Sequence, residues 1–229
     1  VSNFNLSLRS RTYLIGKLKH GNYDMHGTDI SIVIPAKNEG DSLKSLLPEL
    51  VSLYPQAEII VVNDGSTDST TEICAQNKVK VINHVYSKGN GASIKTGARA
   101  ATGNILVFMD GDGQHQPKDI SQLLEGLDAG SDMVVGARNK ESQASVGRLV
   151  ANTFYNKLAS WISGHKVLDL TSGFRAVYRQ KFREFIYLLP NGFSYPTTIT
   201  MAFFRAGYSV KYLPIVALAR EGKSHINIF

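Results

Sequence analysis

From residue 29 onward, the apolar positions of this chain follow two patterns, one typical of strands and one typical of helices. Short apolar runs, such as residues 105–109, are too short for helices and are bounded by glycine, so they predict buried strands. Leucines spaced three and four apart, as in residues 40–53, predict amphipathic helices. The predicted strands are residues 30–34 (ended by Pro35), 58–62, 79–83, 105–109 and 132–135. The predicted helices between them are residues 40–53, 68–76, 92–101 and 117–127.

This order of strand and helix predicts an α/β fold with a mainly parallel sheet and helices on both faces. The alternation ends after Gly136. The remaining pattern predicts a helix over residues 145–162 with Trp161 on its apolar side, helices near 180–188 and 196–206, and a strand at 209–213. We expect one domain over residues 29–229, preceded by a basic extension of residues 1–28.

Composition is that of an ordinary globular protein, with 43% hydrophobic and 19% charged residues. The single cysteine, Cys74, excludes an internal disulfide and fits a reducing compartment. The net charge of +6 suits nucleic acid, an anionic membrane or a phosphorylated substrate. Because the chain has no zinc-type Cys/His spacing and no RNA-binding aromatic motif, we expect no nucleic-acid partner.

The chain has no run of about 18 uninterrupted apolar residues, the length that a membrane-spanning helix needs. The best candidate, residues 197–219, is broken by Arg205, Lys211 and Pro214. We therefore expect a cytoplasmic protein, peripheral on the cytoplasmic face of a membrane. A continuation past Phe229 into a membrane anchor is left open, and the extension has no assigned role.

The acidic motif Asp110-Gly111-Asp112-Gly113-Gln114-His115 directly follows the apolar run of residues 105–109. Ligands of open α/β sheets bind outside the carboxyl ends of the strands, so both carboxylates are expected in one crevice. Magnesium typically uses one or two carboxylates together with substrate phosphates. The alternative is an ordinary acidic turn, because Asp and Gly are common turn residues.

Two further polar segments follow predicted strands. Asp64 follows the second strand, where a carboxylate either accepts hydrogen bonds from a nucleoside or caps the next helix. Lys88 precedes a glycine-containing helix start, a combination that favours an anionic group. Neither a P-loop nor a dinucleotide-binding glycine motif is present.

Taken in order, several motifs resemble family 2 glycosyltransferases with the GT-A fold, over roughly residues 29–224. The branch they most resemble includes dolichol-phosphate mannose synthase and bacterial polyprenyl-phosphate glycosyltransferases. The motifs are IVIPAKNE, IIVVNDGSTD, SKGNGASIKTGARAATGNI, LVFMDGDGQHQP, VVGAR, DLTSGFRA and GFSYPTTITMAFFRAGY. Many relatives have alanine at the position of Gly111, and this difference leaves both carboxylates of the motif in place.

The resemblance implies a donor half, about residues 29–115, and an acceptor half, about residues 116–229. In the donor half, four residues would hold the nucleoside of a GDP- or UDP-linked sugar: Pro35, Ala36, Glu39 and Asp64. Asp110, Asp112 and Gln114 would hold Mg²⁺ or Mn²⁺ at the donor's diphosphate, where the cation stabilises the leaving group. His115 is interpreted as a loop residue that is not a ligand.

In the acceptor half, the resemblance implies a set of residues that clamp a lipid phosphate: Arg138, Arg148, Asn152, Arg220 and Lys223. The planar fork of arginine suits phosphate geometry. Asp169 either orients the sugar or pairs with Arg175, and the ion pair is the favoured interpretation. The expected catalytic residues are Asp112, Arg138, Arg148 and Asp169.

The sequence therefore predicts an inverting glycosyltransferase that moves a sugar from a nucleotide diphosphate to a polyprenyl phosphate. An acceptor phosphate is already anionic near neutral pH, so no strong general base is required. One alternative is a family 2 transferase with a hydroxyl acceptor, for which Asp169 is the best available base. Another is a non-catalytic basic module that binds a surface, and a nucleotidyltransferase is more distant.

Overall fold

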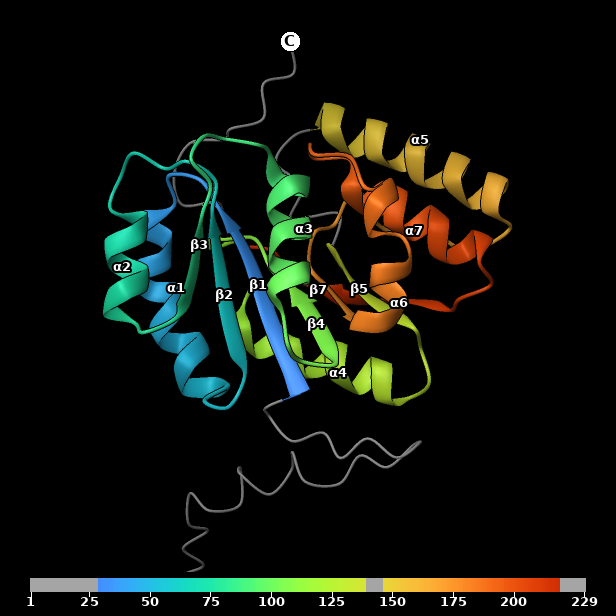
Figure 1. The fold of residues 1–229 in the computed structure, drawn as a ribbon. Coiled ribbons are helices and arrows are strands. Elements are labelled where there is room, and N and C mark those ends of the chain that lie inside the picture. Colours follow the sequence, from blue (N-terminus) through green and yellow to red (C-terminus); the bar gives the residue numbers. More distant parts are fainter. Residues whose placement is uncertain (1–28, 139–145, 219–229) are drawn as a thin grey trace, which may run out of the picture.

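The computed structural model describes residues 29–138 and 146–218, with the backbone alone for residues 146–151. Seven strands in this part of the chain form one sheet in the order β3-β2-β1-β4-β6-β5-β7 (Figure 1). The strands are β1 (Ile30–Ala36), β2 (Glu58–Asn63), β3 (Lys80–Asn83), β4 (Ile105–Phe108), β5 (Met133–Arg138), β6 (Arg175–Tyr178) and β7 (Val210–Ile215). All pairs are parallel except those of β6, which runs antiparallel to β4 and β5.

Helices cover both faces of the sheet (Figure 1). One core cluster joins the sheet to α1 (Gly40–Leu53), α2 (Thr70–Gln76) and α4 (Ile120–Asp128). A second joins the opposite face to α3 (Asn90–Ala100), α6 (Arg179–Glu184) and α7 (Tyr195–Arg205). The long helix α5 (Val146–Ser163) packs over α7, and 3₁₀ turns occur at Pro117–Asp119 and Ile186–Leu188.

The central strand β1 is buried along its whole length, which explains its continuous apolar sequence. Successive side chains point to opposite faces, so Ile32 joins the α1 side of the core and Val33 joins the α3 side. Gly97 of α3 lies directly over β1, where a Cβ would overlap the Val33 side chain. The small residue therefore lets α3 approach the sheet closely.

The predicted α/β architecture and the mainly parallel sheet are confirmed. Three details differ from the sequence-based expectations. Strand β1 continues through Pro35 to Ala36, strand β6 was not predicted, and the helix expected near residues 180–188 is divided into α6 and a 3₁₀ turn. Trp161 lies on the apolar side of α5 as predicted, but 82% of its surface is exposed, because that side faces away from the core.

Among the helices in the described residues, none combines the length and the apolar character needed to cross a bilayer. The parallel strands β1, β2 and β4 end at the same edge of the sheet, as does β5. This carboxyl edge gathers the polar motifs identified in the sequence.

Candidate active site at the carboxyl edge of the sheet

Asp64, which follows β2, is buried, and its carboxylate accepts four hydrogen bonds. His84 Nδ1 and the backbone N–H of Lys88 donate to Oδ1 at 2.7 and 2.8 Å. The Ser87 hydroxyl and the backbone N–H of Gly89 donate to Oδ2 at 2.8 and 2.9 Å. Burial alone would raise the pKa of Asp64, but these donors outweigh it and the pKa is lowered. Asp64 thus fixes the loop between β3 and α3.

Pro35 and Ala36, predicted to hold the nucleoside together with Asp64, lie at the end of β1, and Glu39 precedes α1, where its backbone N–H donates to Thr70 Oγ1 at 3.2 Å. All three are buried, and the Ala36 carbonyl accepts the Asp64 backbone N–H at 2.8 Å. The structure therefore joins Ala36 and Asp64 of this predicted set. Since a carboxylate has about four lone-pair positions, the Asp64 side chain is occupied by the protein's own donors.

The amino end of α3, where the sequence suggested an anion site, is occupied by protein carbonyls. The backbone N–H groups of Gly91 and Ala92 donate to Gly192 O and Asn191 O at 3.2 and 3.0 Å. Lys95 from the same helix donates to Asn191 Oδ1 at 2.7 Å. These two backbone N–H groups are therefore not available to bind an anion, although the sequence suggested an anion site at this helix end. Lys88, just before it, is exposed.

The acidic motif follows β4 as predicted. Asp112 is buried, whereas 32% of the Asp110 side chain is exposed. The Gln114 backbone N–H donates to Asp112 Oδ1 at 3.2 Å, and the Gln114 backbone carbonyl accepts the Leu218 N–H at 2.9 Å. The Gln114 side-chain amide also donates to Leu218 O at 3.4 Å. The chain segment ending at Leu218 is thus bound to the acidic motif.

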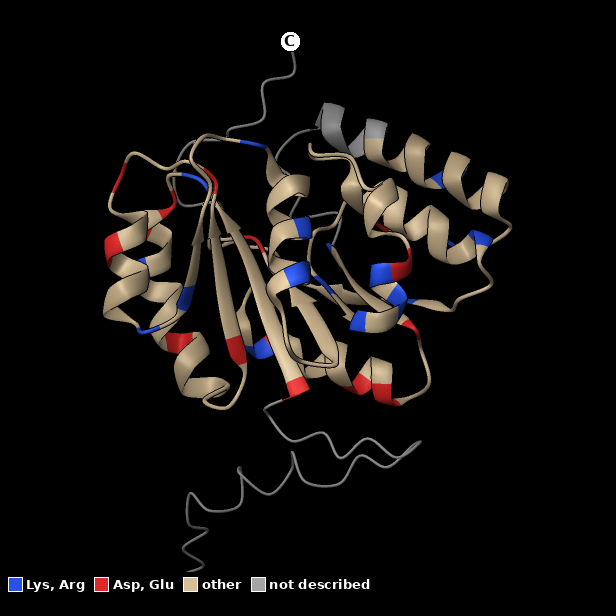
Figure 2. Cartoon of the chain, in the orientation of Figure 1, with Lys and Arg blue, Asp and Glu red and all other residues tan. Residues whose placement is uncertain are grey.

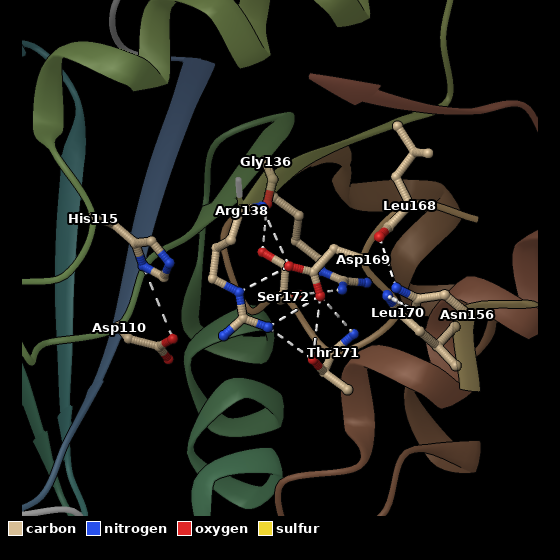
Figure 3. Close-up of polar contacts among 11 residues, drawn as sticks. Asp110, His115, Gly136, Arg138, Asn156, Leu168, Asp169, Leu170, Thr171 and Ser172 are labelled. Atoms are coloured by element: carbon tan, nitrogen blue, oxygen red, sulfur yellow. Dashed lines mark hydrogen bonds and ion pairs between the residues drawn. The ribbon is translucent and has the colours of Figure 1, made fainter. Parts of the chain in front are cut away.

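His115 is packed inside the protein, close to Asp110 and Asp112. Its ring stacks on Phe174 with a centroid separation of 4.8 Å, and its Nδ1 lies 3.9 Å from Asp110 Oδ2 (Figure 3). Burial lowers the pKa of His115 to about 4, so the imidazole is neutral at pH 7. His115 therefore lies in the loop after β4, as the sequence suggested, but its side chain is buried.

Asp169 pairs with Arg138, so the predicted ion pair with Arg175 is wrong. Arg138 Nε and Nη2 donate to the two oxygens of Asp169 at 2.8 and 3.0 Å, and Nη2 also donates to Thr171 Oγ1 at 2.8 Å (Figure 3). Burial would raise the pKa of Asp169, but the bonds and charge of Arg138 keep it lowered. Asp110 and Asp112 contribute to the raised pKa of Arg138, so all four charges share one site.

Arg175 is fully buried at the start of β6 and supports the loop of residues 171–173. Its guanidinium donates to Ser172 O, and to Thr200 Oγ1 at 3.2 Å. Gly173 in this loop faces Asp110, because a Cβ there would lie 2.9 Å from Asp110 Oδ2. Arg175 thus sits behind the loop that presses against the acidic motif, a role that its sequence position did not indicate.

The remaining predicted acceptor residues are only partly described. Arg148 and Asn152 lie on α5, but the Arg148 side chain is outside the described residues, and Asn152 is half-buried. Arg220 and Lys223 also lie outside the described residues. The sequence reasoning missed His84 and Asn156, which hold Asp64 and the Asp169 loop respectively. Neither residue belongs to a motif, so no local signal marked it.

The chain resembles known glycosyltransferases in sequence and in fold. It is 30% identical over 206 residues to the polyprenol monophosphomannose synthase of Mycolicibacterium smegmatis, covering 83% of this chain and 77% of the relative. It is 33% identical over 180 residues to the dolichol-phosphate mannosyltransferase of Pyrococcus furiosus, covering 72% of this chain and 50% of that relative.

A solved structure with the same fold is glucosyl-3-phosphoglycerate synthase from Mycobacterium tuberculosis in complex with Mn²⁺ and UDP-glucose. The TM-score is 0.70 at 22% identity, covering 90% of this chain and 78% of that chain. This likeness confirms the GT-A fold. Residues 31–186 match the family described as "Glycosyl transferase family 2". The chain therefore belongs to glycosyltransferase family 2.

Proposed function

We propose that this chain transfers a sugar from a GDP- or UDP-linked donor to a polyprenyl phosphate. The names of the relatives support this class of acceptor. Residues 29–115 would bind the donor, and residues 116–229 would bind the acceptor. The enzyme would act at the cytoplasmic face of a membrane, where its lipid acceptor resides.

The hydrogen bonds and the burial of the Asp169 carboxylate are the observation that favours a phosphate acceptor over a hydroxyl acceptor. A hydroxyl acceptor needs a base to remove its proton, and Asp169 was the best candidate in the sequence. In the structure, its carboxylate accepts hydrogen bonds from Arg138 and Thr171, is buried and has a lowered pKa. A carboxylate stabilised in this way is a weak base. An acceptor phosphate, whose second pKa is about 6, needs no base at pH 7.

The reaction would be a single in-line displacement that inverts the anomeric carbon. An oxygen of the acceptor phosphate forms the new bond to that carbon, while the bond from the carbon to the donor's diphosphate oxygen breaks. Arg138 would supply positive charge for the phosphate groups at the site, and its orientation is fixed by Asp169. Arg148, Asn152, Arg220 and Lys223 would complete the acceptor side. Leu218, two residues before Arg220, is bound to Gln114.

The acidic motif fits a divalent cation. Two carboxylates follow β4, one of them partly exposed, and oxygen donors of this kind suit Mg²⁺ or Mn²⁺. Among the described residues, no group of three or more His, Cys, Asp or Glu side chains is placed to hold a metal ion by itself, and substrate phosphates would complete the ligands. Asp110 and Asp112 would hold the ion, with Gln114 Oε1 beside them. When bound, it offsets the negative charge that develops on the leaving diphosphate.

Transfer of label from GDP- and UDP-sugars to a polyprenyl phosphate, with Mg²⁺ or Mn²⁺ present, tests this proposal. We expect label in the organic phase, lost in Asp112→Ala. Asp41→Ala is the matched control, because this aspartate is 94% exposed on α1. Labelled lipid that persists in Asp112→Ala would contradict the assignment of the acidic motif. Label found only in a sugar or another hydroxyl compound would favour the hydroxyl-acceptor alternative.

A further inference from the structure

Helix α5 presents its apolar side to the outside of the molecule. Five large apolar side chains on it are exposed: Phe154 (62%), Tyr155 (56%), Leu158 (39%), Trp161 (82%) and Ile162 (61%). At 3.6 residues per turn, these positions lie within an arc of about 120° on one side of the helix. They form a continuous stripe, which we call the α5 stripe. Scattered single apolar residues are normal on a protein surface, whereas a contiguous stripe marks an interaction site.

The opposite side of α5 is polar or small, and it faces the protein. Ala159 is buried in a cluster with Phe204 of α7. Ser160 accepts the Val167 backbone N–H at 2.9 Å, and Asn156 donates to Leu168 O at 2.7 Å. Turning the stripe inward would break these bonds. The hydrogen bonds and packing of the inner side therefore keep the apolar side of α5 facing outward.

We propose that the α5 stripe docks on the surface of a lipid bilayer. Trp and Tyr, which the stripe contains, favour the membrane–water interface because their rings are apolar and their tips are polar. The sequence from residue 142 to residue 168 contains no Asp or Glu, and it contains Arg148, Lys157 and Lys166. Figure 2 accordingly shows no acidic colour on the described part of α5. An apolar face flanked only by cations is typical of helices that lie on anionic membranes.

The stripe is connected to the active site through Asn156. This residue, on the inner side of α5, donates to Leu168 O and accepts the Leu170 backbone N–H at 3.0 Å (Figure 3). Those two contacts flank Asp169, which in turn orients Arg138. Docking of α5 would therefore hold the Arg138–Asp169 pair close to the membrane surface. This step rests on the proposed function, because only a lipid acceptor makes that placement useful.

Trp161 is the only tryptophan of the chain, so its fluorescence reports directly on the α5 stripe. The test is a titration of the full chain with vesicles of phosphatidylcholine containing about 30% phosphatidylglycerol. We expect the Trp161 emission to shift to shorter wavelength and to be quenched by brominated lipid. Sedimentation with the same vesicles measures the bound fraction. Binding without any change in Trp161 emission would overturn the proposal, because another surface would then make the contact.

Leu158→Glu places a charge in the stripe while leaving Trp161 in position. Burying one leucine contributes enough free energy that we expect vesicle affinity to fall about tenfold. Leu53→Glu is the matched control, because Leu53 on α1 is also a helical leucine and is 43% exposed. Equal affinities for the two variants would contradict docking through α5. A concentration-dependent dimer that buries Trp161 without vesicles, measured by light scattering, would assign the stripe to a second copy instead.

Transfer to a short, water-soluble prenyl phosphate separates this proposal from the proposed function. Leu158→Glu should retain that reaction and lose transfer to a long-chain acceptor in vesicles. If the wild-type chain binds vesicles through Trp161 but transfers no sugar to either acceptor, docking stands and the proposed function fails. If it transfers sugar to the soluble acceptor but leaves Trp161 unchanged on vesicles, the proposed function stands and docking fails.

Discussion

Arg138, at the end of β5, donates hydrogen bonds to both carboxylate oxygens of Asp169, from Nε at 2.8 Å and from Nη2 at 3.0 Å. A planar fork bound in this way has a fixed orientation, which a single contact would not give. The pair is mostly buried, with 5% of the Asp169 side chain and 27% of the Arg138 side chain exposed. We therefore propose that Asp169 acts on the site through Arg138, as a positioning residue rather than as a base.

Replacing Asp169 tests that distinction. Asp169→Asn leaves Arg138 without its charge partner, and we expect a loss of about 2–4 kcal/mol in the free energy of unfolding. Transfer to a phosphate acceptor should fall about tenfold and should keep the shape of its dependence on pH. Urea unfolding and kcat measured against pH check both effects. A folded variant that loses transfer completely, and whose plot of kcat against pH loses the fall at low pH seen in the wild-type chain, would instead identify Asp169 as the base.

Replacing Asp64 should loosen the loop between β3 and α3. In Asp64→Asn, the new NH₂ group would face two donors in place of an acceptor: either His84 Nδ1 and the Lys88 N–H, or the Ser87 hydroxyl and the Gly89 N–H. We expect the free energy of unfolding to fall by about 2–3 kcal/mol. Hydrogen exchange should accelerate at Lys88 and Gly89. Asp41→Asn, on the exposed side of α1, should change neither quantity.

Gly91 should not tolerate a side chain, although alanine favours helices. A Cβ at Gly91 would overlap the Pro190 carbonyl oxygen and would lie 2.8 Å from Gly192 O. The usual gain of about 1 kcal/mol for Gly→Ala in a helix should therefore become a loss, measured as a lower Tm. Gly192→Ala is the matched control, because a Cβ there meets nothing within 4 Å. A higher Tm for Gly91→Ala would show that the loop of residues 190–192 does not pack on α3 as described.

Glu58 should make the stability depend on pH in the acid range. Burial would raise its pKa, but hydrogen bonds from Ser31, Thr102 and Lys80 lower it from 4.5 to about 2. The stabilisation is thus complete above about pH 4.5 and is lost as the pH falls toward 2. Because 20% of the side chain is exposed, we expect about 1–2 kcal/mol. In urea unfolding, Glu58→Gln should be less stable than the wild-type chain at pH 7 and nearly equal to it near pH 2.

The sequence pattern predicted the elements whose signals are local. The apolar run before Asp110 predicted the strand observed as β4, and the leucine spacing of residues 40–53 predicted the helix observed as α1. Strand β6 was missed because it has four residues and begins with Arg175, a charged residue at a fully buried position. Its place between β4 and β5 depends on contacts that no local pattern encodes.

The sequence predicted which residues belong to the candidate site, but it did not predict which of them form hydrogen-bonded pairs. Motif positions placed Asp64 and Asp112 just after the carboxyl ends of two strands, and both lie there, after β2 and β4. Sequence proximity favoured Arg175 as the partner of Asp169, whereas the fold brings in Arg138, 31 residues away. The outward direction of Trp161 was equally unreadable, because an amphipathic pattern does not tell which side faces the core.

The most direct test of the central claim compares two acceptors that differ only in the phosphate. A short prenyl phosphate and the corresponding prenyl alcohol are offered to the wild-type chain with the same nucleotide sugar and Mg²⁺ or Mn²⁺, and kcat/KM is measured for each. Because no base is available in Asp169, we expect the phosphate to be preferred by at least about a hundredfold. Comparable values for the two acceptors, or a higher value for the alcohol, would contradict the account.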